Sequence, residues 1–260
     1  MIEKEELLPD VKNIKTQETY TLPSKGLVYA PEDNIPAALT LRRMTTKEDK
    51  MRLRNQSEEQ TRKDLLQACI LEPIDAGKLK LMDANFLLFR LRGISLLSDI
   101  YKIYCRCPNC GTEFVHEVNL LDIPIKYMNK DKLEKLTTIL PISQAKIELQ
   151  YPTIDNIISM GKELREFTSR YPNADRGEYL YTLSASVYIY KVNGNTLMRE
   201  EIENYLDNMD ILDSRALREA ISSLDDEYGF EDELLAKCPS CGNDVKHGLP
   251  ITSELFTPSK

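Results

Sequence analysis

Four of the six cysteines of this chain occur in two copies of one short motif, C-P-x-C-G, which begin at Cys107 and Cys238. A motif of this kind places two thiolates on a tight turn, where the glycine allows backbone amides to face the sulfur atoms. Two such turns together supply the four thiolates of a tetrahedral zinc site, and a closed site of this type stabilises a fold without doing chemistry. We therefore predict a structural zinc ion bound by Cys107, Cys110, Cys238 and Cys241.

Other potential ligands lie near these motifs. His116 and His247 are the only histidines, and they occupy matching positions after the second cysteine of each motif. Because four thiolates already complete the coordination of zinc, we expect hydrogen bonding near the sulfur atoms, with ligation as the alternative. Cys105 could replace a ligand, but no cysteine stands in the equivalent position before Cys238, so we expect a strand thiol. Cys69 lies in an apolar, helix-like stretch and is expected in the core.

Catalytic chemistry is not indicated by these residues. A catalytic zinc needs an open coordination position and usually a nearby general acid or base, whereas His116-Glu117 does not continue as H-E-x-x-H. The chain also contains no phosphate-binding loop, dinucleotide-binding glycine motif or nucleophile elbow. We predict that the protein is not an enzyme.

Charge is distributed unevenly along the chain, whose formal net charge is −8. Residues 198–234 carry a large excess of acidic over basic side chains, which indicates a solvated face or a surface for a basic partner. Nucleic-acid binding, as in a zinc-ribbon regulatory or nucleic-acid-associated protein, stays an alternative function. Its basic candidates are interleaved with acids, which favours a solvated helix pair; they are Arg42, Arg43, Lys47, Lys50, Arg52, Arg54, Arg62 and Lys63.

The flanks of the two cysteine motifs resemble each other. Asp83 precedes Cys107 by almost the same interval as Asp213 precedes Cys238, and each aspartate is followed by apolar residues at helical spacing. We therefore expect Asp83 and Asp213 to cap two equivalent helices. Each motif is also followed by a Pro-Ile pair.

The resemblance extends further upstream. Residues 39–41 and 147–149 alternate like strands, and each strand is followed by a threonine that can begin a helix, Thr45 or Thr153. The shared order of strand, helices, turn, helix and cysteine motif predicts an internal duplication. Residues 129–145 are expected to connect the two copies and to contain a short helix over 131–138.

These patterns predict an α+β fold with two similar halves, each of helices and short strands, joined by a shared zinc-ribbon-like site. The predicted boundaries are an extended N-terminal arm over 1–37, a first half over 38–128, a connector over 129–145 and a second half with its tail over 146–260. We expect Tyr20–Tyr29 of the arm to contact either the body or another subunit. No secretory signal opens the sequence and no apolar run approaches the length of a membrane span, so we expect a reducing cytoplasm.

Several short motifs also occur in a characteristic order. They are Leu22–Tyr29, Leu39–Arg42 with Met44 and Thr45, Asp83–Arg92, the first cysteine motif with Leu120 and Asp122 beyond it, and, more loosely, Leu249–Phe256. In this order they resemble the baseplate hub and hub-assembly proteins of T-even-like contractile-tailed bacteriophages. The resemblance implies a non-enzymatic part of the baseplate hub, or a factor that helps the hub assemble. It also implies other hub proteins and the tape measure protein as partners within a larger assembly, in the host cytoplasm or in the virion tail.

Overall fold

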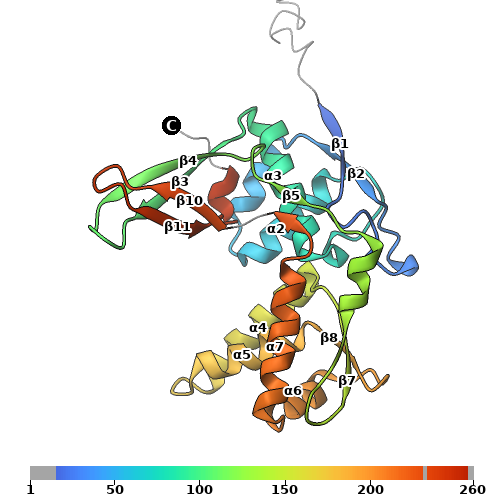
Figure 1. Cartoon of the computed structure of the whole chain (residues 1–260). Helices are drawn as coiled ribbons and strands as arrows, with labels where there is room; N and C mark the ends of the chain where they lie inside the picture. The colour runs from blue at the N-terminus through green and yellow to red at the C-terminus, as the bar shows by residue number, and fades with distance from the viewer. Residues whose placement is uncertain (1–15, 231–232, 257–260) are drawn as a thin grey trace, which may run out of the picture.

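The computed structural model describes residues 16–230 and 233–256, in which helices alternate with small antiparallel sheets. An upper body contains α2 and α3, a lower body contains α4 to α7, and two hairpins project together from the upper body (Figure 1). The elements of the upper body, in chain order, are β1 (Gln17–Thr21), β2 (Ala38–Arg42), α1 (Thr46–Asp49), α2 (Glu58–Cys69), α3 (Leu81–Leu96), β3 (Ile100–Arg106) and β4 (Glu113–Asn119).

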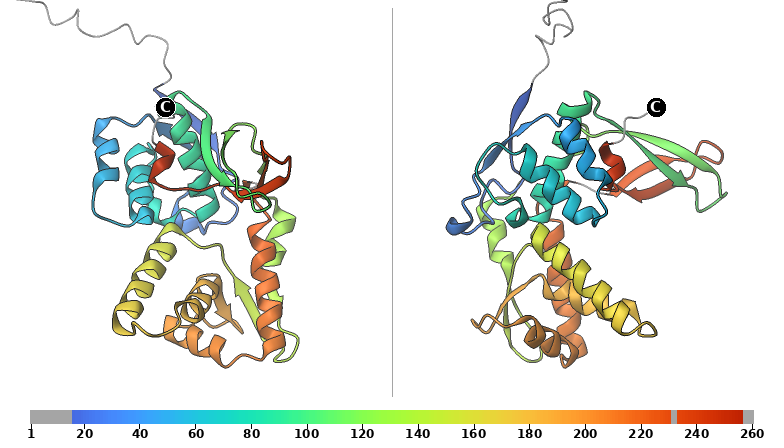
Figure 2. Two further views of the ribbon diagram at one scale, coloured as in Figure 1. Left: turned by 90° about the vertical axis from the view of Figure 1, so that its left-hand side faces the viewer. Right: turned by 180° about the vertical axis from the view of Figure 1, so that it is seen from behind.

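The lower body and the returning chain complete the fold. Its elements are β5 (Ile125–Lys126), β6 (Thr137–Ile139), β7 (Lys146–Leu149), α4 (Ile154–Arg170), α5 (Arg176–Ser186), β8 (Ile189–Val192), α6 (Arg199–Asp207), α7 (Ile211–Asp225), β9 (Gly229–Phe230), β10 (Glu233–Lys237) and β11 (Asp244–Gly248). The α+β class expected from the sequence is confirmed. The left-hand view of Figure 2 shows the separation of the two bodies most clearly.

The upper core is built around α3, which is apolar on most of its surface and therefore buries residues on all sides. Phe86, Leu87 and Leu91 of this helix are at most 2% exposed. The β1–β2 hairpin covers one side, and the ring of Tyr20 packs edge-on against Phe86 with 6.3 Å between ring centroids. Residues 20–29 thus contact the body, which was one of the two options expected for the arm.

The lower core lies between the sheet β6–β7–β8 and the helices α6 and α7. Ile147 and Leu149 of β7 alternate toward this core, as the sequence pattern predicted, and share it with Leu217 and Leu224 of α7. The short helix expected over 131–138 is present as a 3-10 helix, Lys130–Leu136.

The chain crosses between the two bodies at several points. Phe230, Leu249, Leu255 and Phe256 follow the lower body in sequence but pack in the upper core. In the opposite direction, residues 27–28 of the first part pack against the lower core. Each core therefore contains residues from both sides of the predicted boundaries.

Two threonines begin helices as expected. Thr45 caps α1 and Thr153 caps α4, and in each case the third helical residue, Glu48 or Asn156, accepts a hydrogen bond from the backbone amide of the threonine. This reciprocal arrangement satisfies amides at the start of a helix that have no partner within it.

The expectation that Asp83 and Asp213 cap helices is wrong. Both lie at the third helical position, and the residues that precede the helices are Lys80 and Asp210. Both aspartates are at most 1% exposed. A carboxylate so deeply buried needs hydrogen-bond donors, and these come from distant turns of the chain.

Asp83 holds a turn that begins with Leu22-Pro23. Its carboxylate accepts hydrogen bonds from the Ser24 amide at 3.0 Å and from the Tyr29 hydroxyl at 2.7 Å. Burial raises the pKa of Asp83 to about 6. These two hydrogen bonds thus connect the chain after β1 to the first turn of α3.

Asp213 holds a second turn that begins with Leu140-Pro141. Its two carboxylate oxygens accept hydrogen bonds from the backbone amides of Ile142, at 2.7 Å, and Ser143, at 3.0 Å. Burial opposes ionisation, but the hydrogen bonds prevail and lower the pKa of Asp213. The chain between β6 and β7 is thereby fixed to the first turn of α7.

Candidate metal centre

Each C-P-x-C-G motif forms the same turn at the tip of a hairpin. In the first, the Gly111 amide donates to the Cys107 carbonyl at 2.9 Å, and in the second Gly242 donates to Cys238 at the same distance. Gly111 and Gly242 have φ angles of 75° and 71°, a left-handed conformation that glycine adopts without strain. The sequence motif therefore encodes the local geometry of both turns.

Two hairpins bring the turns together. β3 and β4 pair in antiparallel register, as do β10 and β11, and the hairpins lie side by side (Figure 1). The inner faces share a small apolar cluster in which Phe114 packs against Cys107, Cys238 and Val245. Packing along the hairpins thus positions the cysteines at their tips.

The four sulfur atoms of Cys107, Cys110, Cys238 and Cys241 lie within 4.8 Å of one another. The Sγ atoms of Cys107 and Cys241 are 3.7 Å apart, and those of Cys110 and Cys238 are 3.6 Å apart. A tetrahedral zinc ion with Zn–S bonds of about 2.3 Å separates its sulfur ligands by about 3.8 Å. The donor set and its spacing fit zinc, and the pairs are too far apart to be disulfides.

Neighbouring polar groups surround the sulfur atoms. The Asn109 side-chain amide donates to Cys241 Sγ at 3.7 Å, which links the first turn to the second. Cys110 Sγ lies 3.2 Å from the Thr112 hydroxyl, and hydrogen bonding with Thr112 lowers the pKa of Cys110 to about 6. The pKa of the neighbouring Cys107 thiol shifts in the opposite direction, to about 11, so without a metal ion the two thiols of the first turn do not ionise together. Sequence reasoning did not identify Asn109, although its place inside the motif was a signal.

The two histidines bond to each other and not to the sulfur atoms. Nδ1 of His116 lies 2.8 Å from Nε2 of His247, and the rings meet edge to face. Burial and the proximity of His247 lower the pKa of His116. The expected hydrogen bonding near the sulfur atoms is corrected, since the pair joins the fourth residue of β4 to the fourth residue of β11. Their matched distance from the cysteines was the signal for this pairing.

The remaining cysteines lie outside the cluster. Cys105 is buried on β3, where burial raises the pKa of its thiol. Cys69 is fully buried at the end of α2, and burial raises its pKa to about 11. Both occupy the positions expected of a strand thiol and a core thiol.

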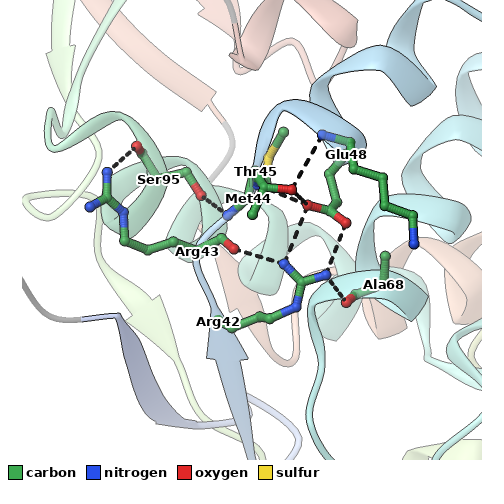
Figure 3. A network of polar contacts seen from close by, with 8 residues as sticks. Arg42, Arg43, Met44, Thr45, Glu48, Ala68 and Ser95 are labelled. Atoms are coloured by element: carbon green, nitrogen blue, oxygen red, sulfur yellow. Dashed lines mark hydrogen bonds and ion pairs between the residues drawn. The ribbon is translucent and has the colours of Figure 1, made fainter. Parts of the chain in front are cut away.

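The basic residues considered for nucleic-acid binding are largely engaged within the fold. Arg42 contacts the buried carboxylate of Glu48 at 2.9 Å and donates to the Ala68 carbonyl at 2.7 Å (Figure 3). Arg43 donates to the Ser95 carbonyl at 3.0 Å. Carbonyls and carboxylates satisfy these guanidinium groups and fix β2 between α2 and α3.

Four more of these basic residues form ion pairs with nearby carboxylates. Arg52 contacts Asp49 at 2.8 Å, and Lys63 contacts Asp155 at 2.7 Å. Arg54 and Arg62 face Asp64 and Glu59 at 3.5 and 3.6 Å. An arrangement of this kind favours the solvated helix pair expected from the sequence over a phosphate-binding surface.

Comparison with known proteins agrees with the resemblance to phage baseplate proteins. The family model described as T4 bacteriophage base plate protein matches residues 15–257. The chain belongs to this family. No curated protein and no solved structure matches the chain.

Membership of the baseplate family implies a structural component of a phage tail, assembled with other phage proteins. The hairpins, the cysteine cluster and both cores all lie within the matched residues. Over the part of the chain that is described, no helix is both long and apolar enough to cross a membrane. Membership of a structural family favours a non-enzymatic role.

Proposed function

We propose that this baseplate protein is a non-enzymatic component of the baseplate hub, or a factor that assembles it, and that a structural zinc ion joins two related halves. The observation that carries the proposal is the four-thiolate cluster, formed by two turns from widely separated parts of a baseplate-family chain. Its contacts would be with other hub proteins and the tape measure protein, in the host cytoplasm during assembly and in the tail if the protein is retained.

The internal duplication is part of this proposal. The strongest support is the matched pair of buried aspartates, each at the third position of a helix and each bound to a turn that starts with Leu-Pro. Each of these helices is followed by a hairpin that ends in a cysteine turn. On this interpretation the connector over 129–145 corresponds to the N-terminal arm, because both contain the Leu-Pro turn.

The zinc ion would act as a clamp between the hairpins. The apolar cluster at the hairpin tips is small, with Phe114 and Val245 as its main members besides cysteines. Metal coordination contributes folding free energy directly when the apolar surface is this limited. Four thiolates complete the coordination, which leaves no open position for a substrate.

Metal analysis tests the zinc assignment. Purified protein is expected to contain close to one zinc ion per chain. Cys107→Ser or Cys241→Ser should lower zinc content and the thermal stability, whereas Cys105→Ser, a buried thiol outside the cluster, should leave zinc content unchanged. Equal zinc content in all three variants would refute the assignment.

Quantitative mass spectrometry of purified phage particles and of tail precursors tests the assembly role. A hub component is expected in both, whereas an assembly factor is expected in precursors alone. Absence from both samples would contradict the assembly role. It would not affect the zinc assignment, which the metal analysis tests separately.

A further inference from the structure

A groove of about 520 Å³ lies between α6, the start of α7 and the turn after Leu140-Pro141. Its volume falls in the range of ligand-binding clefts, about 300–1,000 Å³. One side of α6 forms a wall, because its lining residues recur at helical spacing. Its acidic lining residues are Glu201, Asp210 and Asp213, and its apolar ones include Ile142, Leu197 and Met209.

The groove is negatively charged and has no cation of its own among the described residues that line it. Glu201 and Asp210 are exposed at its rim, and Asp213 lies in its floor, where hydrogen bonds keep its pKa low. The cation nearest in sequence on α6, Arg199, pairs with Glu163 and Glu203, at 3.3 Å each. The three carboxylates of the groove accept backbone amide hydrogen bonds, but among the described residues that line it none has a cationic side-chain partner.

The same groove has an apolar side. Ile142 is 55% exposed, although it follows a proline in a turn whose backbone is fixed by Asp213. Leu197 and Met209 are half-buried where they line the groove, and Tyr205 lines it with them. Exposed apolar side chains on a fixed backbone are typical of surfaces that bind another chain.

A metal ion does not fit this arrangement. Within residues 16–230 and 233–256, the four cysteines form the one cluster whose ligand atoms are close enough for a metal. The carboxylates of Glu201 and Asp210 are also already oriented by hydrogen bonds from the amides of Met198 and Leu212, at 2.7 and 2.8 Å. Separate carboxylates with apolar groups between them suit an ammonium or guanidinium group on a peptide.

We propose that this groove binds a basic segment of a partner protein. Lysine or arginine side chains of this segment contact the carboxylates of Glu201 and Asp210, and its apolar side chains pack on Ile142, Leu197 and Met209. Charge complementarity accelerates the encounter and selects the partner, while the apolar contacts contribute to affinity. The inference deepens the assembly role proposed above and rests on it for the nature of the partner.

The test uses full-length protein and an array of overlapping peptides that covers the other tail proteins encoded in the same genome. The groove variant combines Glu201→Gln with Asp210→Asn, which keeps the helix caps because glutamine and asparagine serve in these positions. The control variant combines Glu200→Gln with Glu219→Gln, which removes the same charge from exposed sites on the same two helices outside the groove.

Peptides that bind the wild-type protein are expected to contain lysine or arginine next to apolar residues. The groove variant should bind them at least about tenfold more weakly, and the control variant should bind them within about twofold of wild type. Equal weakening in both variants would overturn the inference, since it would indicate a general charge effect. An array without bound basic peptides would overturn it as well.

Incorporation into particles distinguishes a failure of the assembly role from a failure of the groove inference. If wild-type protein enters tail precursors and the groove variant enters equally well, the groove inference fails and the assembly role stands. If wild-type protein does not enter precursors, the assembly role fails irrespective of the peptide array.

Discussion

Glu48 is a buried carboxylate whose partners are all close. It accepts hydrogen bonds from the Thr45 amide and hydroxyl, at 2.8 and 2.7 Å, and contacts Arg42 at 2.9 Å. The hydrogen bond from Arg42 is the main cause that lowers the pKa of Glu48 to about 2. One side chain thus closes a helix cap and neutralises an arginine that also binds the Ala68 carbonyl on α2.

We expect Glu48→Gln to destabilise the protein by about 1.5–3 kcal/mol, because Arg42 would lose its charged hydrogen-bond partner. Urea denaturation at pH 7 measures the loss. Glu59→Gln is the matched control, since its ion pair with Arg62 is longer, at 3.6 Å, and partly exposed; it should change stability by less than about 1 kcal/mol.

The same carboxylate predicts a pH dependence. The folded-state pKa of Glu48 is lowered to about 2 from an ordinary value of 4.5, so its contribution is full above pH 4.5 and is lost as pH falls toward 2. Stability measured between pH 5 and pH 2.5 should therefore fall more steeply for wild type than for Glu48→Gln. Parallel curves would show that Glu48 does not contribute to acid sensitivity.

The histidine pair gives a second pH dependence at higher pH. Because the folded-state pKa of His116 is lowered below 6.5, protonation favours the unfolded chain, and stability is lost as pH falls below about 6.5. His247→Gln removes the neighbouring charge and should reduce the difference in stability between pH 7.5 and pH 5.5. The comparison between variants cancels proton competition for the cysteines, which is common to both.

At the scale of elements, each cysteine turn depends on a glycine with positive φ. An alanine Cβ at Gly111 would meet nothing within 4 Å, so the cost of substitution is conformational and not steric crowding. Gly248 at the end of β11 is equally unobstructed, but its φ angle is not in the left-handed region. Comparing alanine substitutions at the two sites therefore separates the effect of backbone conformation on stability from the effect of packing.

We expect Gly111→Ala to destabilise the hairpin joint by about 1–2 kcal/mol, the cost of placing a residue with a Cβ in the left-handed region. Gly248→Ala should stay within about 0.5 kcal/mol of wild type. Thermal unfolding of the zinc-loaded protein compares the two variants. A loss that is equal in both would show that the φ angle at Gly111 does not limit stability.

Local signals were sufficient to predict several elements from the sequence. Thr45 and Thr153 were expected to begin helices, and the strands at 39–41 and 147–149 follow from alternation, because each depends on residues nearby in the chain. Asp83 was misassigned as a cap because its donors, Ser24 and Tyr29, lie in a distant part of the sequence. The geometry of the cysteine turns was predictable, whereas the contact between the two histidines depends on how the hairpins pack.

At the scale of the whole molecule, the two bodies share their cores. The side chain of Arg92 is fully buried in the upper body and donates to the Leu255 carbonyl at 2.8 Å. Arg52 donates to the Phe256 carbonyl at 2.9 Å. No sequence pattern pointed to this return of the chain, because the apolar residues of this segment do not themselves indicate which core they enter.

We expect Phe256→Ala to destabilise the protein by about 3–5 kcal/mol, in the range of buried aromatic truncations. Leu235→Ala is the control, since Leu235 is 61% exposed on β10 and should change stability little. Hydrogen exchange would locate the effect, with faster exchange expected in α3 than in α7. Uniform acceleration throughout would instead indicate that the two bodies unfold as one unit.

The return of residues 249–256 to the upper core has a consequence for biosynthesis. Domains usually fold from the N-terminus while the ribosome is still translating, but here the first body lacks Leu255 and Phe256 until translation has passed the whole lower body. The first cysteine turn likewise waits for the second, because Cys107 and Cys241 are separated by most of the lower body. Translation products that stop before residue 249 therefore lack the segment that completes the upper core, and we expect them to be less stable than the full chain.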